Sequence, residues 1–425
     1  MSAIATQESK VNPISSKITR RRFGRCVASV GGAVLANASA PLVWAESSAG
    51  TKPAFDVKEI RTISQTPDLY CGWPTLTRRK GGQLVLVWSG GREQHVCPFG
   101  RVDMMRSDDE GVTWTWPRTI LDGAIDDRDA GVVETAKGSL LVTTFTSLAY
   151  QPQLDKQIAL AGNQAAGNQA ARNQAAGQTL WPTERLRRWR SVHERISAAE
   201  RSAELGQWMI RSTDGGVTWS QRYSSIVNSP HGPIQLTDGR LLYAGKELWT
   251  GDHAIGVCES SDDGISWRWL GKIPTREGDD PANYHELHAV ESSGGRLIAH
   301  IRNQNPTDDR ETLQSESDDG GKTWTTPHTI GVWGLPSFLM TLHDGRLLMT
   351  YGHRRKPLGI QARVSSDDGA SWSDPMIIYG DATSGDLGYP STVEFDGGDL
   401  LTVWYERLSG SDKAVLRQAR WRIGH

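Results

Sequence analysis

Arginine, carboxylate, histidine and aromatic side chains gather at the ends of short apolar runs in this 425-residue sequence. Histidines and carboxylates can transfer protons, a tyrosine hydroxyl beside a base can act as a nucleophile, and arginine can hold an anion with paired hydrogen bonds. The alternative explanation is that strand ends are polar because solvent covers them. The candidate site residues are Trp73, Arg92, His95, Arg128, Asp129, His231, His285, Glu286, Arg302, Arg354 and Tyr389.

The apolar runs beside these candidates are predicted to form six β-hairpins, because alternating or apolar segments flank Asp-Gly, Gly-Gly or Lys-Gly turns. The first strand of a hairpin leaves one face and the second strand returns to it. Residues just before the first strand and just after the second therefore share a face, and we expect the candidates to converge there. The hairpins span residues 73–90, 129–145, 231–245, 285–302, 335–353 and 389–406.

Five turns of the form Ser-x-Asp-x-Gly-x-(Thr/Ser)-Trp follow five of these hairpins, with a period of about 50 residues that is typical of a repeat architecture. Six hairpins, five of them followed by such a turn between two further strands, predict an all-β fold, a six-bladed β-propeller over residues 55–425. The turns span residues 107–114, 212–219, 260–267, 317–324 and 365–372.

A structural role is expected for these turns, because Ser and Asp can cap their own turn, glycine accepts a positive φ, and tryptophan can pack against the blade. We expect them at the rim of the propeller, away from the candidate site. Calcium binding is the alternative, but the turns lack the number of ligands that an EF-hand supplies.

The second blade is predicted to contain an insertion over residues 148–206, because the first two turns are about twice as far apart as the others. Its low-complexity tract, residues 163–178, is expected to be a mobile loop. The stretch after it has helical spacing and a predicted cap at Thr183. Such an insertion either covers the site as a lid or decorates the edge of the blade.

Residues 1–45 resemble a twin-arginine export signal, with a basic stretch, a short apolar run and small residues before cleavage after Ala40 or Ala45. This signal predicts a periplasmic or secreted protein without membrane insertion after its removal; a disordered basic tail is the alternative. The sequence contains 47 Lys and Arg against 49 Asp and Glu. This balance argues against nucleic acid or an acidic membrane as the main partner.

Three cysteines remain after such a cleavage, namely Cys71, Cys97 and Cys258. A Cys71–Cys97 disulfide and three buried free thiols both fit this odd number. No CxxC pair indicates a metal site, and the chemistry considered below needs no cofactor.

The five turns resemble the Asp-boxes of sialidases (neuraminidases), which are six-bladed propellers, and the resemblance covers most of the chain after residue 55. The hairpin at 285–302 is similar to the stretch that holds the family's catalytic glutamate and one of its arginines, which fall on Glu286 and Arg302. The hairpin at 389–406 is similar to the stretch that holds the nucleophilic tyrosine, which falls on Tyr389. The hairpin at 231–245 also resembles its third-blade counterpart.

The resemblance implies that three arginines grip a substrate carboxylate, that the tyrosine attacks the anomeric carbon with help from the glutamate, and that an aspartate is the acid/base. Guanidinium groups suit a planar carboxylate. An anionic sugar repels a carboxylate nucleophile, so a neutral tyrosine beside a base is a sensible substitute among retaining glycosidases.

Two departures make this sequence a divergent relative. The family's first arginine is absent, because Gly72-Trp73-Pro74 stands where the family has Arg-Ile-Pro. The first-blade loop also has no aspartate where the acid/base is expected. The candidates that would replace the missing arginine are Arg92 and Arg128, those for the third arginine are Arg354 and Arg355, and those for the acid/base are Glu93, His95, Asp129 and His285.

These observations favour an exported, exo-acting glycoside hydrolase of sialidase type that removes a terminal sialic acid or a related acidic sugar from glycans. In this hypothesis Tyr389 is the nucleophile, Glu286 its base, and Arg302 with Arg354 the carboxylate clamp, while His231, His285 and Trp73 contact the substrate. A non-catalytic carbohydrate-binding propeller is the first alternative. Inverting hydrolysis by a His/Asp pair and water is the second.

Overall fold

The computed structural model describes residues 54–165, 179–249 and 251–424. Within these residues the chain forms six antiparallel four-stranded sheets, and the first or second strands of consecutive sheets contact one another in a closed ring. We number the sheets as blades one to six. The predicted six-bladed β-propeller is therefore confirmed. Residues 1–45, with the predicted export signal, lie outside the described residues.

Four strands, ordered from the axis outwards, make up each blade. Blades one and two contain β2 (Tyr70–Arg78), β3 (Leu84–Arg92), β4 (Arg101–Ser107) and β5 (Arg118–Leu121), then β6 (Asp126–Glu134), β7 (Leu140–Ser147), β8 (Gln207–Ser212) and β9 (Tyr223–Ser224). Blades three and four contain β10 (Ile234–Gln235), β11 (Leu241–Lys246), β12 (Ile255–Ser260) and β13 (Arg268–Lys272), then β14 (Tyr284–Glu291), β15 (Leu297–Asn303), β16 (Glu311–Ser317) and β17 (His328–Trp333). Blades five and six contain β18 (Ser337–Thr341), β19 (Leu347–His353), β20 (Gly359–Ser365) and β21 (Met376–Tyr379), then β22 (Leu387–Glu394), β23 (Asp399–Arg407), β24 (Ala414–Ile423) and β1 (Phe55–Thr62).

Blade six is closed by the two ends of the propeller. The outer strand β1 pairs antiparallel with β24, so that Phe55 lies opposite Ile423. In this blade the third and fourth strands come from opposite ends of the sequence, and no turn connects them. This explains why six hairpins are accompanied by only five Asp-boxes.

The five Asp-boxes join the third and fourth strands of blades one to five. In each box the serine hydroxyl donates to the aspartate and accepts from the glycine N–H. The same aspartate accepts from the N–H and the hydroxyl of the Thr or Ser before the tryptophan. The acidic side chain is thus engaged within its own turn, where it stabilises the backbone.

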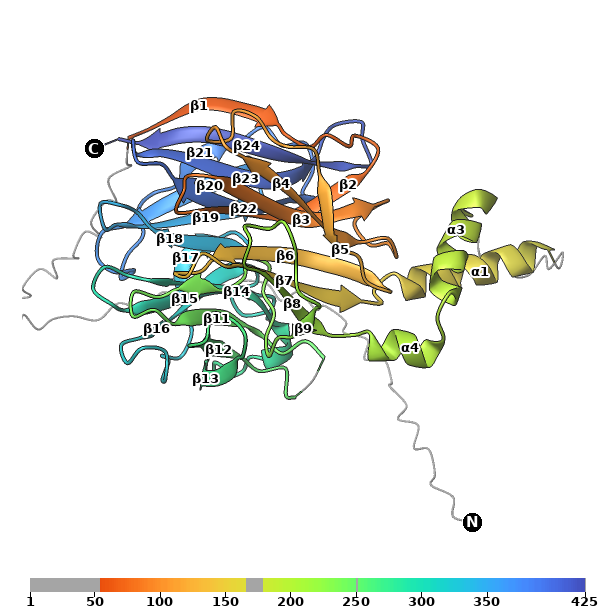
Figure 1. Cartoon of the computed structure of the whole chain (residues 1–425), viewed down its shortest axis with the longest axis horizontal. Coiled ribbons are helices and arrows are strands. Elements are labelled where there is room, and N and C mark those ends of the chain that lie inside the picture. Colours follow the sequence, from red (N-terminus) through yellow and green to blue (C-terminus); the bar gives the residue numbers. More distant parts are fainter. Residues whose placement is uncertain (1–53, 166–178, 250, 425) are drawn as a thin grey trace, which may run out of the picture. The chain divides into compact units, whose positions relative to one another are not determined.

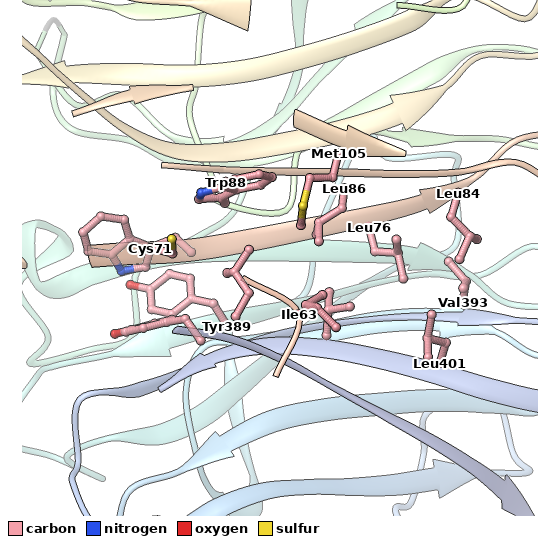
Figure 2. Packing of buried hydrophobic residues seen from close by; sticks show 14 of the residues in the cluster. Ile63, Cys71, Leu76, Leu84, Leu86, Trp88, Met105, Tyr389, Val393 and Leu401 are labelled. Carbon is pink, nitrogen blue, oxygen red and sulfur yellow. The ribbon is translucent and has the colours of Figure 1, made fainter. Parts of the chain in front are cut away.

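Apolar side chains fill the space between neighbouring blades. In the cluster between blades six and one, Leu84, Val393 and Leu401 lie at one end, and Cys71 and Tyr389 lie at the other (Figure 2). Because the core is close-packed, the contacts that hold these two blades together also restrain the Tyr389 ring.

Blade three has a shorter first strand than the sequence predicted. Strand β10 contains two residues, although the hairpin was expected to begin at residue 231. Gly232 has a φ of 74°, and Pro233 has no N–H to donate to the neighbouring strand. A Cβ atom on Gly131 would lie 2.4 Å from the Gly232 nitrogen, so the backbones of blades two and three meet here without space for a side chain.

The insertion leaves blade two between β7 and β8. Its described part contains α1 (Gln151–Ala165), α3 (Thr183–Glu194) and α4 (Ala198–Ala203), which lie together beside the strands in Figure 1. Most of the low-complexity tract, residues 166–178, lies outside the described residues. Trp189 of α3 is fully buried and belongs to a cluster with Tyr150, Leu154 and Cys97. Since Cys97 follows β3, the helices pack against a loop of blade one.

The helix cap predicted at Thr183 is wrong. The N-cap of α3 is Pro182, whose side chain makes no capping hydrogen bond, and Thr183 is already helical. A capping box is found instead at α4, where Ser197 and Glu200 satisfy each other's backbone N–H groups.

All three cysteines outside the predicted signal are buried free thiols. The structure thus contains no Cys71–Cys97 disulfide, and the alternative of free thiols describes it. Along the described ranges, the structure has no helix that combines the length and the apolar character needed to cross a membrane.

Candidate active site

The first strands of blades six, one and two share one irregularity near their start. Trp73, Asp129 and Tyr389 have positive φ values of 54°, 44° and 54°, and the register with the second strand shifts there, so that two residues oppose one. Positive φ is rare for bulky residues and stores about 1–3 kcal/mol of strain at each position. Such β-bulges re-aim side chains beside active sites. The same device thus presents three candidate side chains in adjacent blades.

Tyr389, Glu286 and Arg302 form a hydrogen-bonded cluster. The Tyr389 hydroxyl donates to Glu286 Oε1 at 2.5 Å, and Arg302 Nη1 lies 2.6 Å from Glu286 Oε2 and 3.2 Å from Tyr389 Oη. Arg302 stands opposite His285 in the β14–β15 pair, which places it beside Glu286. The side chains of Glu286 and Arg302 are 17% and 16% exposed, so a ligand can reach this pair.

The charge state of the cluster follows from burial and from its own contacts. Burial and the Glu286 charge raise the pKa of Tyr389 well above its usual value. Burial also raises the pKa of Glu286, but the Arg302 charge and the hydrogen bonds from Arg302 and Tyr389 outweigh this effect and lower it. The result is a neutral phenol beside an ionised carboxylate, which can take the phenol proton during nucleophilic attack.

Asp129 is a second buried carboxyl group within electrostatic reach of Glu286. It is 6% exposed, and its Oδ1 atom has no hydrogen-bond partner. Burial raises the pKa of Asp129 to about 7 against the lowering effect of Arg128, and the Glu286 charge adds to the rise. Asp129 therefore changes charge near neutral pH, as a general acid or base must.

Three candidate arginines lie at the cluster. Arg302 touches Tyr389 directly, and Arg354 Nε donates at 3.0 Å to the carbonyl of Leu387, two residues before the tyrosine. The guanidinium carbon of Arg128 lies 4.6 Å from the centre of the Trp73 ring.

Two other candidate arginines are engaged by other protein groups, although Arg92 also lies 4.9 Å from the centre of the Trp73 ring. The Arg92 side chain is fully buried, donates to both carboxylate oxygens of Asp126 at 2.7 and 2.9 Å, and also donates to Ser89 and to the His95 carbonyl. Arg355 is stacked 3.9 Å from the centre of the Trp333 ring. We therefore leave Arg92 and Arg355 out of the residues that would contact a substrate.

Trp73, His231 and His285 contribute uncharged surfaces around the cluster. The Trp73 and His231 rings lie 6.3 and 6.5 Å from the Tyr389 ring, centre to centre. Burial lowers the pKa of His231 to about 3 and that of His285 to about 4. His231 also lines a cavity of about 650 Å³ that extends to the hairpin turns at the other end of the first strands.

His95 belongs to a second polar cluster. Its Nδ1 atom lies 2.8 Å from the Tyr70 hydroxyl and 3.1 Å from Asp386 Oδ1, while its side chain is 46% exposed. Asp386 also accepts from the hydroxyls of Tyr70 at 2.9 Å and Tyr405 at 3.2 Å. The Trp73 ring lies edge-on to His95, with 5.0 Å between ring centres.

Asp386 and Tyr70 were missed by the sequence reasoning. Tyr70 lies three residues before Trp73, and Asp386 lies three residues before Tyr389. This common spacing becomes apparent only when the hairpin starts are aligned on the positive-φ residues that the structure shows.

Glu93, another candidate for the acid/base, is hydrogen-bonded to residues of the insertion. Its carboxylate accepts from Arg188 and from the Trp189 indole N–H of α3, and its carbonyl accepts from Lys413 at 2.6 Å.

Across residues 54–165, 179–249 and 251–424, no three His, Cys, Asp or Glu side chains converge as a metal site requires. The arrangement brings together a phenol, carboxyl groups, imidazoles and guanidinium groups.

Comparison with known proteins identifies the family and the fold. The model of the BNR repeat-like domain matches residues 153–401, over half of the chain; no curated protein matches. A Dyadobacter fermentans protein of unknown function is 20% identical with a TM-score of 0.67, over 88% of this chain and 100% of its own. A Hadza microbial sialidase is 19% identical with a TM-score of 0.56, over 82% and 65%. An intramolecular trans-sialidase from Ruminococcus gnavus is 13% identical with a TM-score of 0.55, over 86% and 97%.

Proposed function

The chain belongs to the BNR repeat-like domain family and has the six-bladed fold of sialidases, and we propose that it is a glycoside hydrolase that removes a terminal sialic acid or a related acidic sugar from glycans. The observation that carries this proposal is the 2.5 Å hydrogen bond from the Tyr389 hydroxyl to Glu286, with Arg302 in contact with both. A neutral nucleophile with its base and a cation suits a substrate that carries its own negative charge.

The proposed reaction has two steps. Tyr389 Oη attacks the anomeric carbon while Glu286 takes the phenol proton, and the glycosidic C–O bond breaks as an acid protonates the leaving oxygen. Water then attacks the same carbon and gives a proton to the conjugate base of that acid, the bond to Tyr389 Oη breaks, and Glu286 returns its proton to the tyrosine. Two displacements at one carbon retain the anomeric configuration. Product analysis by NMR separates this course from the inverting alternative.

The substrate carboxylate would be held mainly by Arg302 and Arg354. Guanidinium groups form paired, charge-assisted hydrogen bonds with planar carboxylates. Gly72 stands where a further arginine was expected, and Arg128, whose guanidinium carbon lies 4.6 Å from the centre of the Trp73 ring, is our candidate to replace it. His231, His285 and Trp73 would border the sugar. The leaving-group proton would come from Asp129 or His95.

Export is a second part of this proposal. Residues 1–45 contain the arginine run and the short apolar segment of a twin-arginine signal, and glycans on cell surfaces are reached from outside the cytoplasm. Replacement of Arg20, Arg21 and Arg22 by lysine should leave the protein in the cytoplasmic fraction of an expressing bacterium. Equal amounts of wild type and variant outside the cytoplasm would contradict it.

The enzyme proposal is tested with purified protein and a panel of aryl sialosides and aryl uronides. We expect release of the aryl group by the wild type and loss of release in Tyr389→Phe. Tyr379→Phe is the matched control, since Tyr379 lies on the outer strand β21. If the wild type cleaves no acidic glycoside, the proposal fails. Binding to a glycan array without turnover would then favour a carbohydrate-binding propeller.

A further inference from the structure

The hydrogen bonds around Asp386 determine which nitrogen of His95 carries a proton. Burial raises the pKa of Asp386, but the hydrogen bond and charge of His95 and the hydrogen bonds from Tyr70 and Tyr405 lower it overall, so the carboxylate only accepts. Tyr70 donates its single proton to Asp386. We therefore assign the His95 ring proton to Nδ1, which lies 3.1 Å from the acceptor Asp386 Oδ1, and this leaves Nε2 to exchange protons with a ligand.

The His95–Asp386 pair lies one aromatic ring away from the nucleophile. The Trp73 ring contacts His95 at 5.0 Å and Tyr389 at 6.3 Å between ring centres. Tyr405 contacts the Tyr389 ring at 5.8 Å and donates to Asp386. The buried Trp73 ring thus lies between the Tyr389 cluster and the His95–Asp386 pair, in contact with both.

Asp129 occupies a different place. Electrostatic interactions with Glu286, Arg302 and Tyr389 place it near the nucleophile and its base. It is also buried, whereas nearly half of the His95 side chain is exposed. An exposed imidazole can be reached by the leaving group of a bound glycan more easily than a buried carboxyl group, which favours His95 as the proton donor.

We propose that His95, oriented by Asp386, protonates the leaving oxygen and then deprotonates water in the hydrolysis proposed above, on which this inference rests. In the first step the Nε2–H bond of the imidazolium breaks as the glycosidic oxygen gains the proton and the sugar is transferred to Tyr389 Oη. In the second step neutral Nε2 takes a proton from the water whose oxygen bonds to the anomeric carbon, which regenerates the imidazolium. Asp386 stabilises that cation through Nδ1–H and is a positioning residue.

The loop that carries His95 is held from two directions. Inside the propeller, Arg92 Nη2 donates to the His95 carbonyl at 3.1 Å while the same guanidinium is paired with Asp126. Outside, Gln94 Nε2 donates at 3.0 Å to Gln153 of α1. The insertion of blade two therefore supports the loop of blade one, which gives the helices a role in fixing the proton donor.

The test compares leaving groups on the same acidic sugar. Nitrophenolate departs without a proton, whereas a sugar alcohol needs one, so the loss of a general acid affects only the second substrate strongly. For His95→Ala we expect kcat/KM to fall at least about 100-fold for the sugar-linked substrate and to fall far less for the para-nitrophenyl glycoside. Asp386→Asn should show the same pattern. Azide, which needs no deprotonation, should accelerate turnover of the nitrophenyl glycoside by His95→Ala.

His328→Ala is the matched control. His328 is 51% exposed and lies 2.8 Å from Glu316 on the outer strands of blade four, so it is a comparable carboxylate-paired histidine away from the cluster. Equal losses of kcat/KM for both leaving groups, or no loss in His95→Ala, would overturn the assignment while the proposed function stands. A wild type that cleaves neither substrate would overturn both.

Discussion

The Tyr389 hydroxyl lies 2.5 Å from Glu286 Oε1, although the two residues belong to blades six and four, which are not neighbours in the ring. No local element brings them together, and the contact forms only when the propeller closes. Closure depends on β1, which pairs with β24 and completes blade six. The contact between Tyr389 and Glu286 is thus a product of the whole fold rather than of one motif.

The first prediction concerns Glu286 as a base. In Glu286→Gln the amide cannot take the Tyr389 proton, so we expect kcat to fall by about 10²–10⁴-fold with a smaller change in KM. Glu291→Gln, on the same strand β14, is the control and should keep wild-type kcat. Similar kcat values for Glu286→Gln and wild type would show that Tyr389 is not activated by this carboxylate.

The second prediction concerns Arg354 and the substrate carboxylate. Loss of a charge-assisted interaction should reduce kcat/KM for an acidic glycoside by about 10–100-fold, corresponding to about 1.5–3 kcal/mol. The carboxamide analogue of the same substrate should lose far less in Arg354→Ala. Arg355→Ala, which removes the neighbouring arginine stacked on Trp333, is the control. An equal loss for the acid and the amide would assign Arg354 to the fold rather than to the carboxylate.

The third prediction concerns the pH dependence contributed by Asp129, whose pKa burial raises to about 7. Below pH 7 the carboxyl is protonated and neutral, and above it the group carries a negative charge beside Glu286. That charge repels an acidic substrate, so KM should rise as pH increases through 7. Asp129→Asn stays neutral and should abolish this rise in KM. A rise of the same size in the variant would contradict the assigned cause.

The periodic parts of the fold could be predicted from the sequence, because each blade repeats the same hairpin and five blades repeat the same turn. The positions of Glu286, Arg302 and Tyr389 followed from that periodicity together with the resemblance to a family. The shortened strand β10 did not, because it depends on the close approach of Gly131 and Gly232 from adjacent blades.

The second polar cluster could not be predicted, because it depends on contacts between segments far apart in the sequence. His95 and Asp386 are separated by 291 positions, and their pairing depends on blade six lying next to blade one. The burial of Arg92 could not be predicted from the sequence pattern either. An arginine after a strand looks the same in the sequence whether it faces a ligand or a buried carboxylate such as Asp126.

The fourth prediction concerns the Asp-box of blade five and separates stability from activity. Asp367 accepts from the Ser365 hydroxyl at 2.7 Å and from the N–H and hydroxyl of Ser371 at 2.9 and 2.5 Å. Asp367→Ala removes these bonds, and we expect the free energy of unfolding to fall by about 1–3 kcal/mol while kcat/KM is unchanged. Urea denaturation and the aryl glycoside assay measure the two quantities.

The loss of unfolding free energy in Asp367→Ala should become smaller at low pH. Burial raises the pKa of Asp367, but the hydrogen bonds from Ser371 and Ser365 lower it overall. A lowered pKa means that the ionised form stabilises the folded state above about pH 4 and that this contribution disappears as the pH falls further. The difference in unfolding free energy between wild type and Asp367→Ala should therefore shrink below pH 4. The control is Asp374→Ala, which replaces an exposed aspartate after the box and should have the unfolding free energy of the wild type at each pH. A loss of kcat/KM in Asp367→Ala without a loss of stability would assign the Asp-box to the reaction.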